Sequence, residues 1–516
     1  MSEPATVAAR VLDPGRSGRY LQSLIEEALR WGGPAPARTP VSAIIPTTGG
    51  PRCGRCLSAL RRAAGSVPLE VILVVTGDGG LELPDADRVV RCEPPFCWAK
   101  ANNAGLRAAS HGLVLLLNDD CFFARERDLE RLVRRLQVCG HLAAVAPAGV
   151  GFAPDFDQGR LPIGSGCWEV DYSLMGACVL LRSEAFWVVG GFDERFTAYG
   201  HDEVDWFYRA RHCGYRWAVD TEIAVHHADG ATFGQRRRAV ELSESRALFV
   251  SIHHVSPEPG PHWRASRPAV SWVIASRNGA GFLGRCLGSI AANRSTWPPD
   301  FEVVLGLDGS TDGSANVVTA FNQSLQEPLP LRLVSFPATA GTAGRAINRV
   351  LRLAKGQVIL PMDDDDATTA GRGRLASMLT GAGELLVGEW TLILLDGSVA
   401  RDRGAATSVQ ELANPGATNW GQCMTAAYRD TWDQFGLHNE ALPVCEDLEL
   451  WLRWMRDGVK VRHATIPVHL YMHRLGSVVS NRQAVTSITQ MLCAAYLRGG
   501  GSTRMGIQTS RGPVER

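Results

Sequence analysis

The sequence of 516 residues lacks a net charge, a long apolar segment and, almost completely, lysine. Its 53 basic and 53 acidic residues balance, which gives no reason to expect nucleic acid or an anionic membrane surface as a partner. Only Lys100, Lys355 and Lys460 are lysines, a bias toward arginine that we attribute to genomic base composition. The most apolar segments, at 112–118 and 385–395, are too short to span a bilayer, so we expect no transmembrane segment.

The first residues, MSEPATVAARVLDPG, lack the basic segment and the apolar run of a secretory signal, and we therefore expect a cytoplasmic protein. Thirteen cysteines suit thiols that stay reduced in that compartment. Cys53 and Cys56 alone have the spacing of a metal-binding or redox pair, and the sequence offers no second pair to complete a zinc site. We interpret this pair as thiols that pack a helix.

The sequence does contain a repeat that spans nearly the whole chain. GRCL at 54–57 returns at 284–287, each time after an apolar, β-branched run that begins at Val41 or at Val270. A second apolar run follows in each half, and then a segment of helical periodicity that leads into a short apolar strand. Such whole-domain self-similarity indicates a tandem duplication.

The repeat extends to polar residues. Gap-free alignment places Asn103 on Asn348, and the three residues from Asn118 on the three from Asp363. DEVDWFYRARHCG (202–214) aligns with EDLELWLRWMRDG (446–458). The alternation of strands and helices predicts an α/β fold with two tandem domains, each a mostly parallel sheet with helices on both faces.

The domain boundaries follow from composition. We place the two domains at 40–255 and 269–480, joined by a linker rich in Pro and Ser at 256–268. Residues 1–39 read as an N-terminal extension. Residues 481–516 read as a C-terminal tail that we expect to be disordered.

The acidic run at 363–366 follows a predicted buried strand, where carboxylates are costly unless a cation neutralises them. Carboxylates are ligands for Mg²⁺ or Mn²⁺, and these ions commonly bridge to phosphate oxygens. A solvated acidic turn is the alternative. It is disfavoured because Asn118, Asp119 and Asp120 repeat the arrangement after the corresponding strand.

Two acids open a predicted helix in each half, Asp202 with Glu203 and Glu446 with Asp447. They either interact with the helix dipole or include a general base that takes a proton from an acceptor hydroxyl. Histidines follow each acidic helix, at 226–227 and at 473, and either serve as structural residues or add a metal ligand.

These residues, in this order, resemble the family 2 glycosyltransferases of the GT-A fold, and the resemblance covers nearly the whole chain twice. The motif residues of the second copy are Ala275 to Asn278, Asp308 to Asp312, Asp363 with Asp365, Glu446 with Asp447, and His473. Those of the first copy are Pro46 to Gly49, Thr76 to Asp78, Asn118 with Asp120, Asp202 with Glu203, and His226 with His227. The segment GGFDERF (190–196) makes the first copy resemble rhamnosyltransferase-like members.

The resemblance implies a metal-dependent, inverting transfer of a sugar from a nucleotide-diphosphate sugar to an acceptor hydroxyl. It implies nucleotide-sugar contacts at Ser276, Asp308 and Asp363 in the second copy, and at Pro46, Thr47, Asp78 and Asn118 in the first. It implies Mn²⁺ or Mg²⁺ at Asp365 and His473, and at Asp120 with His226 or His227. The implied base is Asp447 beside Glu446, and Glu203 or Asp202 in the first copy. The acceptor stays open among a glycan, a lipid-linked sugar, a natural product and a peptide.

The first copy departs from the family pattern, because Thr76 stands where the second copy has Asp308 and because its acid pair is reversed. It is therefore either a second active site or an accessory domain that binds the acceptor. A different reading is a phosphohydrolase, since 364–368 spells the DxDxT motif, although Cys121 replaces its second acid in the first copy. A sugar-nucleotide pyrophosphorylase is a more distant alternative, because the Gly-rich basic loop of that class is missing.

Overall fold

The computed structural model describes most of the chain. The described residues are 39–77, 83–153, 156–197, 200–228, 235–263, 267–393, 399–402, 421–442, 444–472, 492 and 507–509. The chain divides into two compact units. The first unit comprises Pro36–Ala265 with Met505–Arg516, and the second comprises Ser266–Arg504 with Met1–Ala35.

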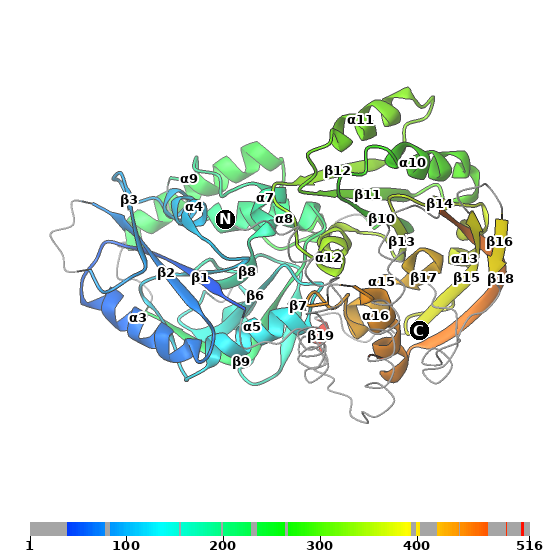
Figure 1. Ribbon diagram of the computed structural model, residues 1–516. Helices are drawn as coiled ribbons and strands as arrows, with labels where there is room; N and C mark the ends of the chain where they lie inside the picture. Colours follow the sequence, from blue (N-terminus) through cyan, green and yellow to red (C-terminus); the bar gives the residue numbers. More distant parts are fainter. Residues whose placement is uncertain are drawn as a thin grey trace. The chain divides into compact units, whose positions relative to one another are not determined.

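The first unit is a mixed sheet with helices on its faces (Figure 1). Its elements are β1 (Val41–Thr47), α3 (Pro51–Ala64), β2 (Leu69–Thr76), β3 (Arg88–Cys92), α4 (Trp98–Ala108), β4 (Leu113–Leu117), β5 (Cys121–Phe123), α5 (Asp128–Val138), β6 (Ala144–Val150), α6 (Asp157–Arg160), β7 (Cys167–Val170), β8 (Cys178–Arg182), α7 (Glu184–Val189), α8 (Asp202–His212), β9 (Trp217–His227), α9 (Gln235–His253), η2 (Pro261–Trp263) and β19 (Ile507–Thr509). The sheet order is β19-β7-β9-β6-β8-β4-β1-β2-β3, with β5 paired to β9.

The second unit has the same architecture. Its elements are β10 (Val270–Ser276), α10 (Leu283–Ala292), η3 (Arg294–Thr296), β11 (Phe301–Asp308), α11 (Ser314–Ser324), β12 (Leu331–Phe336), α12 (Ala343–Leu353), β13 (Val358–Asp363), β14 (Ala367–Thr368), α13 (Gly371–Ser377), β15 (Glu384–Ile393), β16 (Val399–Asp402), η4 (Gln422–Met424), β17 (Thr425–Tyr428), α15 (Arg429–Phe435), α16 (Glu446–Arg456) and β18 (Lys460–Met472). The sheet order is β12-β11-β10-β13-β17-β15-β18-β14, with β16 paired to β15.

The two sheets match strand for strand over most of their width. In each, four parallel strands (β3-β2-β1-β4 and β12-β11-β10-β13) are followed by an antiparallel strand, β8 or β17. The predicted α/β fold with two sheet-based domains is confirmed. The parallel strands end along one edge of each sheet, which is where open α/β sheets bind ligands.

Burial explains why the first strands read as continuous apolar runs. All seven residues of β1 are buried because helices cover both of its faces. Val41 and Ile45 point to the face covered by α3 and α5, where they join a cluster with Leu60 and Leu132. Ile44 points to the opposite face, toward α4.

Helix and strand meet closely in both units, and each contact uses one glycine. A Cβ added at Gly105 on α4 would lie 2.3 Å from Cγ2 of Ile44 and 3.1 Å from Cγ2 of Val74. In the second unit the aligned helix residue is Val350, and its Cγ2 would lie 2.5 Å from a Cβ added at Gly306 on β11. The large and the small partner have therefore exchanged places between helix and strand.

The GRCL motif has the same structural role in both units. The Cys56 thiol donates to the carbonyl oxygen of Asn118 at 3.5 Å, and the Cys286 thiol donates to that of Asp363 at 3.6 Å. Both thiols are buried, as is that of Cys53, and all three are free. The interpretation of Cys53 and Cys56 as packing thiols is confirmed.

Two segments differ from the predicted linker and tail. Residues 507–509 form β19, which pairs in parallel with β7 so that Ile507 lies opposite Cys167. Trp263, inside the predicted linker, is buried against Tyr208 and donates through Nε1 to the carbonyl oxygen of Glu258 at 3.1 Å. Burial of this indole outweighs the Pro- and Ser-rich composition around it. Among the described helices, none is both long and apolar enough to cross a bilayer.

Candidate active sites

In the second unit, neighbouring side chains fix the acidic run at the carboxyl end of β13. The Ser276 hydroxyl, at the end of β10, donates to Oδ2 of Asp364 at 2.5 Å. Arg285 on α10 donates to the backbone carbonyl of Asp365. Asp363 and Asp365 are half-buried. Ser276, Asp363 and Asp365, three of the predicted site residues, thus lie along one strand edge.

Asp308 lies at the end of β11 and is held by the protein itself. Its Oδ1 accepts from the backbone N–H of Ala340 and from Nη1 of Arg349, both at 2.8 Å. Its Oδ2 accepts from the Thr339 hydroxyl at 2.8 Å. Asp308 therefore orients the loop at 339–341, beside the position where the sequence predicts a nucleotide.

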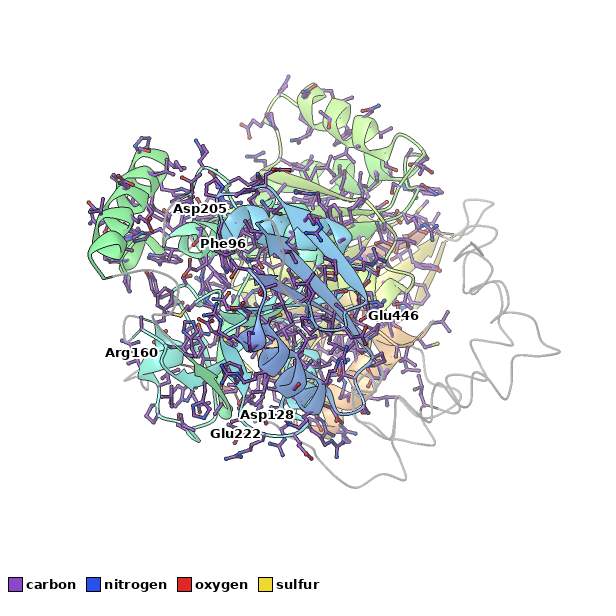
Figure 2. The ribbon with its side chains drawn as sticks, turned by 90° about the vertical axis from the view of Figure 1, so that its left-hand side faces the viewer. Phe96, Asp128, Arg160, Asp205, Glu222 and Glu446 are labelled. Carbon is purple, nitrogen blue, oxygen red and sulfur yellow. The ribbon has the colours of Figure 1, made fainter. Side chains whose placement is uncertain are left out.

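The acid pair of the second unit begins α16 (Glu446 is labelled in Figure 2). Cys445 precedes it with φ of 59°, a left-handed conformation that is unfavourable for a residue with a side chain and is often found at functional sites. Burial, together with the charge of Asp447, raises the pKa of Glu446 to about 8. Burial also raises the pKa of Asp447, to about 6, and Asp363 contributes in the same direction. At neutral pH Asp447 is therefore the ionised member.

Residues 421–422 connect the acid pair to the acidic run. A Cβ added at Gly421 would lie 3.8 Å from Oδ2 of Asp447. The next residue, Gln422, donates through Nε2 to Oδ1 of Asp363 at 2.9 Å. The predicted base and the predicted metal-binding run therefore line one site.

The first unit repeats the acid-pair geometry at the start of α8. His201, before the pair, has φ of 65°. The backbone N–H of Glu203 donates to Oδ1 of Asp202 at 3.1 Å. Burial raises the pKa of both acids, and the charge of Asp202 raises that of Glu203 further, well above its usual range. Burial therefore shifts the pKa of both acids in the same direction in the first unit as in the second.

An asparagine in each unit clamps the loop that precedes the acid pair. Nδ2 of Asn348 donates to the carbonyl oxygen of His438 at 2.8 Å and to Oε1 of Glu440 at 3.1 Å, and its Oδ1 accepts from the His438 N–H at 3.1 Å. Asn103 makes the same three bonds to Phe192 and Glu194, at 2.8, 2.9 and 2.9 Å. The sequence alignment paired the two asparagines without revealing this role.

An arginine on each acidic helix holds the same loop from the other side. Arg453 pairs with Glu449 at 3.1 Å and donates to the carbonyl oxygens of Phe435 and Leu437. Arg209 pairs with Asp205 (labelled in Figure 2) at 2.7 Å, and donates to the corresponding carbonyl oxygens, those of Val189 and Gly191. The acidic helix and the described part of the loop before it are therefore held together by the same contacts in each unit.

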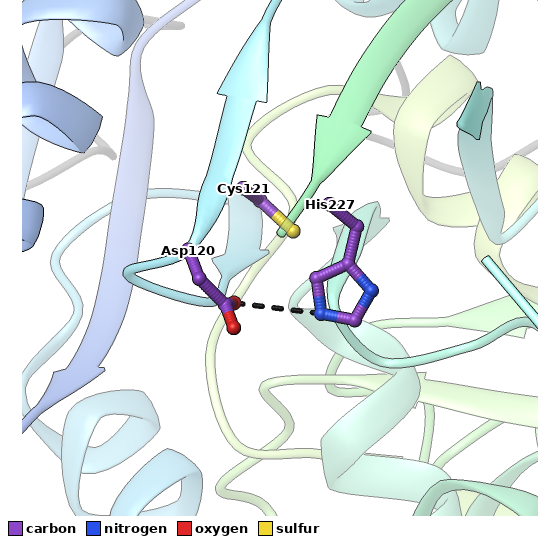
Figure 3. A group of neighbouring side chains, drawn as sticks. All are labelled: Asp120, Cys121 and His227. Carbon is purple, nitrogen blue, oxygen red and sulfur yellow. Dashed lines mark ion pairs between the residues drawn. The ribbon is translucent and has the colours of Figure 1, made fainter. Parts of the chain in front are cut away.

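In the first unit, the strand end shows which histidine faces the acids. Pairing of β5 with β9 places Cys121 opposite His227 and Phe122 opposite His226. Nε2 of His227 lies 3.4 Å from Oδ1 of Asp120 (Figure 3). His226, in contrast, is exposed. Of the two predicted ligands, the structure therefore brings His227 to Asp120.

The other predicted residues of the first unit lie nearby. The Thr47 hydroxyl donates to Oδ2 of Asp119 at 2.6 Å, as Ser276 does to Asp364 in the second unit. Oδ1 of Asn118 accepts from Nε1 of Trp98 at 3.1 Å. Pro46 is buried within β1. Asp78 and His473 lie outside the described residues.

The second unit contains a histidine contact that the sequence did not predict. Nε2 of His469 lies 2.9 Å from Oδ2 of Asp366, and the Met472 N–H donates to Oδ1 of the same carboxylate at 3.0 Å. Cys423 lies in the same buried cluster and accepts through Sγ from the Asp363 N–H at 3.0 Å. Since His469 is 103 residues from Asp366, no local spacing pointed to this pair.

The donor set of the first unit fits a divalent cation. Asp120, Cys121 and His227 each offer one ligand atom, and these atoms lie within 4.8 Å of one another. Oδ1 of Asp120 is buried and has no hydrogen-bond partner among the described residues. A buried carboxylate oxygen with no donor is satisfied when a cation binds it.

Known proteins share parts of this sequence. Residues 271–380 match the model of the family Glycosyl transferase family 2. A stretch of 185 residues is 30% identical to chondroitin synthase of Pasteurella multocida (strain Pm70), covering 34% of this chain and 18% of the relative. A stretch of 189 residues is 31% identical to the O-antigen biosynthesis protein RfbC of Myxococcus xanthus, covering 32% of this chain and 14% of the relative. The matches thus span less than a fifth of each relative's length.

One similar solved structure is the mannosyltransferase PcManGT from Pyrobaculum calidifontis in complex with GDP-Man and Mn²⁺. It is 20% identical with a TM-score of 0.34, covering 50% of this chain and 78% of that chain. The family match falls on β10, β11, β13 and the acidic run that follows them. Residues 271–380 of the second unit are therefore the part of the chain that is similar to family 2 glycosyltransferases.

Proposed function

We propose that the chain is a metal-dependent, inverting glycosyltransferase that moves a sugar from a nucleotide-diphosphate sugar to an acceptor hydroxyl. One observation carries the proposal. Residues 421–422 join the acid pair to the acidic run, so that a base and a cluster of cation ligands face the same strand edge. The family match over 271–380 supports the reaction class.

In this proposal Asp447 is the general base. Its carboxylate takes the proton of the acceptor hydroxyl, whose oxygen attacks the anomeric carbon from the face opposite the diphosphate. The bond between that carbon and the diphosphate oxygen breaks, and the nucleotide diphosphate leaves. Glu446 stays protonated beside Asp447, because two adjacent buried carboxylates do not both ionise readily.

Ser276, Asp308 and Asp363 are proposed to form the nucleotide-sugar site, Ser276 by fixing Asp364 and Asp308 by fixing the loop at 339–341. Asp365 and His473, and Asp120 and His227 in the first unit, would hold Mn²⁺ or Mg²⁺. When bound, the cation supplies charge stabilisation to the departing diphosphate.

We propose that the first unit is a second glycosyltransferase domain, arisen by tandem duplication and rhamnosyltransferase-like. Its proposed contacts are Pro46, Thr47, Asp78 and Asn118, with Asp202 or Glu203 as base. The facing pair of Asp120 and His227 favours an active site. An accessory, acceptor-binding role is the alternative. Thr76 favours this alternative. Its buried hydroxyl has no partner among the described residues, whereas Asp308, at the aligned position of the second unit, makes several hydrogen bonds.

The geometry disfavours the phosphohydrolase reading. That motif needs Asp364 as an available nucleophile, but its Oδ2 accepts from Ser276. Asp366, the second acid, is 1% exposed and bonded to His469 and to the Met472 N–H. Both acids therefore serve the fold.

The proposed acceptor is a glycan, with a lipid-linked sugar, a natural product or a peptide as alternatives, in a cytoplasmic protein. The similarity to a chondroitin synthase and to an O-antigen biosynthesis protein favours a glycan. The domain limits proposed from the sequence, 40–255 and 269–480, accommodate both sites.

The test is thermal stability of the full chain against a panel of nucleoside diphosphates and sugar nucleotides, with Mn²⁺, with Mg²⁺ and with chelator. A ligand that binds the folded state raises the melting temperature. We expect a cation-dependent shift that Asp365→Asn abolishes for at least one nucleotide, with Asp120→Asn as the matched variant. The anomeric configuration of the product, read by NMR, then tests inversion. No shift with any nucleotide, with or without cation, would overturn the proposal.

A further inference from the structure

The pairing of β5 with the end of β9 brings a thiol to the proposed cation site of the first unit. The antiparallel register places Cys121 directly opposite His227, and Asp120 immediately precedes Cys121. Figure 3 shows the sulfur of Cys121 and the carboxylate of Asp120 on the side of the His227 ring. Carboxylate, thiol and imidazole thus surround one position.

The neighbouring charges make Asp120 the acid that remains for a ligand. Asp119 accepts from Thr47 at 2.6 Å and pairs with Arg52 at 3.1 Å, so its charge is already compensated. The backbone of Asp120 is fixed, because its carbonyl oxygen accepts from the Ala228 N–H at 3.0 Å. Its Oδ1 is buried and faces Nε2 of His227 at 3.4 Å, without a hydrogen bond among the described residues.

At the residue after the predicted metal ligand, the second unit has a carboxylate where the first has a thiol, and its own thiol beside Asp366 and His469 comes from Cys423 in η4. Gap-free alignment places Cys121 on Asp366, whose carboxylate is bonded to His469 and to the Met472 N–H. The two units therefore differ in donor chemistry at the residue that follows the predicted metal ligand. Thiolates select zinc-like cations, whereas carboxylates suit magnesium and manganese.

We infer that the first unit binds a thiophilic divalent cation of the zinc class through Asp120, Cys121 and His227. Two ligands of a tetrahedral zinc ion lie roughly 3.5 Å apart, so atoms already within 4.8 Å need only a small adjustment. The Cys121 thiol releases its proton to solvent as the metal–sulfur bond forms. The fourth position is open to water or to a phosphate oxygen. The inference rests on the proposed function for the position of the site, and for the first unit it replaces Mn²⁺ or Mg²⁺ by a zinc-class cation.

Cobalt(II) is the probe, because a thiolate ligand gives it an intense charge-transfer absorption in the near ultraviolet. The full-length chain carrying Asp365→Asn, which weakens the proposed second site, is titrated with Co²⁺ without nucleotide. We expect a charge-transfer band that Cys121→Ser abolishes. Cys423→Ser, which alters the buried thiol cluster of the second unit, is the matched control and should leave the band unchanged.

A second variant covers the case in which Cys121→Ser does not fold. Cys121→Asp reproduces the residue of the second unit, and we expect it to keep Mn²⁺ binding while its preference for Zn²⁺ over Mn²⁺ falls by about tenfold or more. A band that persists in Cys121→Ser, or that disappears in Cys423→Ser, would overturn the inference. If Co²⁺ binding depends on Asp120 and His227 but not on Cys121, the inference fails while the proposed function stands. If none of the three matters, the proposed cation site of the first unit fails as well.

Discussion

The asparagine clamp gives the sharpest test of how the fold positions the acid pair. Asn348 is 1% exposed and is the partner of both the N–H and the C=O of His438. His438 is itself 4% exposed and lies in the loop that leads to Glu446 and Asp447. Asn348→Ala removes both bonds and leaves two buried backbone groups without a protein partner.

The expected size follows from these contacts. A buried backbone group that loses its partner costs about 1–3 kcal/mol, so two such groups are expected to cost about 2–4 kcal/mol when the loop relaxes only in part. That range corresponds to roughly 30- to 900-fold faster local opening. Glu440 also loses a donor, but Arg352 and Arg345 continue to bind it.

Hydrogen–deuterium exchange of the full chain measures this opening, because the His438 amide is itself one of the bonded groups. Asn103→Ala is the matched variant, since it removes the same two bonds from Phe192 in the first unit. We expect each variant to accelerate exchange in its own loop and not in the other. If the His438 amide exchanges within threefold of the unsubstituted chain in Asn348→Ala, the clamp does not hold the loop.

Three further predictions concern the acid pair and the helix that carries it. Because the pKa of Asp447 is raised to about 6 and a base must be ionised, kcat/KM is expected to fall as pH decreases through about 6. Asp447→Asn is expected to lower the rate of nucleotide release by about a hundredfold or more. The pKa of Glu446 is raised from 4.5 to about 8 on folding, so its contribution to stability is full below about pH 4 and is lost as pH rises through about 8. Glu446→Gln should flatten that part of the dependence of Tm on pH, and an unchanged slope would contradict the assignment. Arg453→Met should cost about 3–5 kcal/mol, because it removes the guanidinium that pairs with the buried carboxylate of Glu449. It should lower Tm more than Arg209→Met, since Arg209 is 27% exposed.

The sequence predicted the parts of the fold that depend on local pattern. Apolar runs predicted β1 and β10, and the repeated acids predicted where the strands before Asp120 and Asp365 end. Both features are set by the order of residues along one element. The repeat also aligned Asn103 with Asn348 before their contacts were known. Local pattern and long-range contact agree at these positions.

The alternation of side chains along a strand explains why the sequence alone could not decide which histidine of the first unit faces the acids. Adjacent residues of a strand point to opposite faces, so either His226 or His227 faces the acids, and a shift of one residue exchanges them. The pairing of β5 with β9 decides for His227. This register depends on residues about a hundred positions away, which no local pattern contains.

The exchange of a large and a small residue between helix and strand could not be predicted from the sequence for a related reason. Gly105 aligns with Val350 and Val74 with Gly306, so each position taken alone reads as an unrelated change. Only the contact between helix and strand shows that one small and one large residue are kept in both units. Close packing conserves the summed volume of a contact and not the residue at either position.

The two units keep the contacts that hold the acid pair and change the residues expected to meet a ligand. Both the asparagine clamp and the arginine of the acidic helix recur with the same backbone partners. In contrast, Thr76 stands in place of Asp308, beside the position where a nucleotide is expected. Losing a clamp would cost stability whatever the substrate, whereas a strand-end residue can change without cost to the sheet. This is the pattern we expect if the two proposed sites take different ligands.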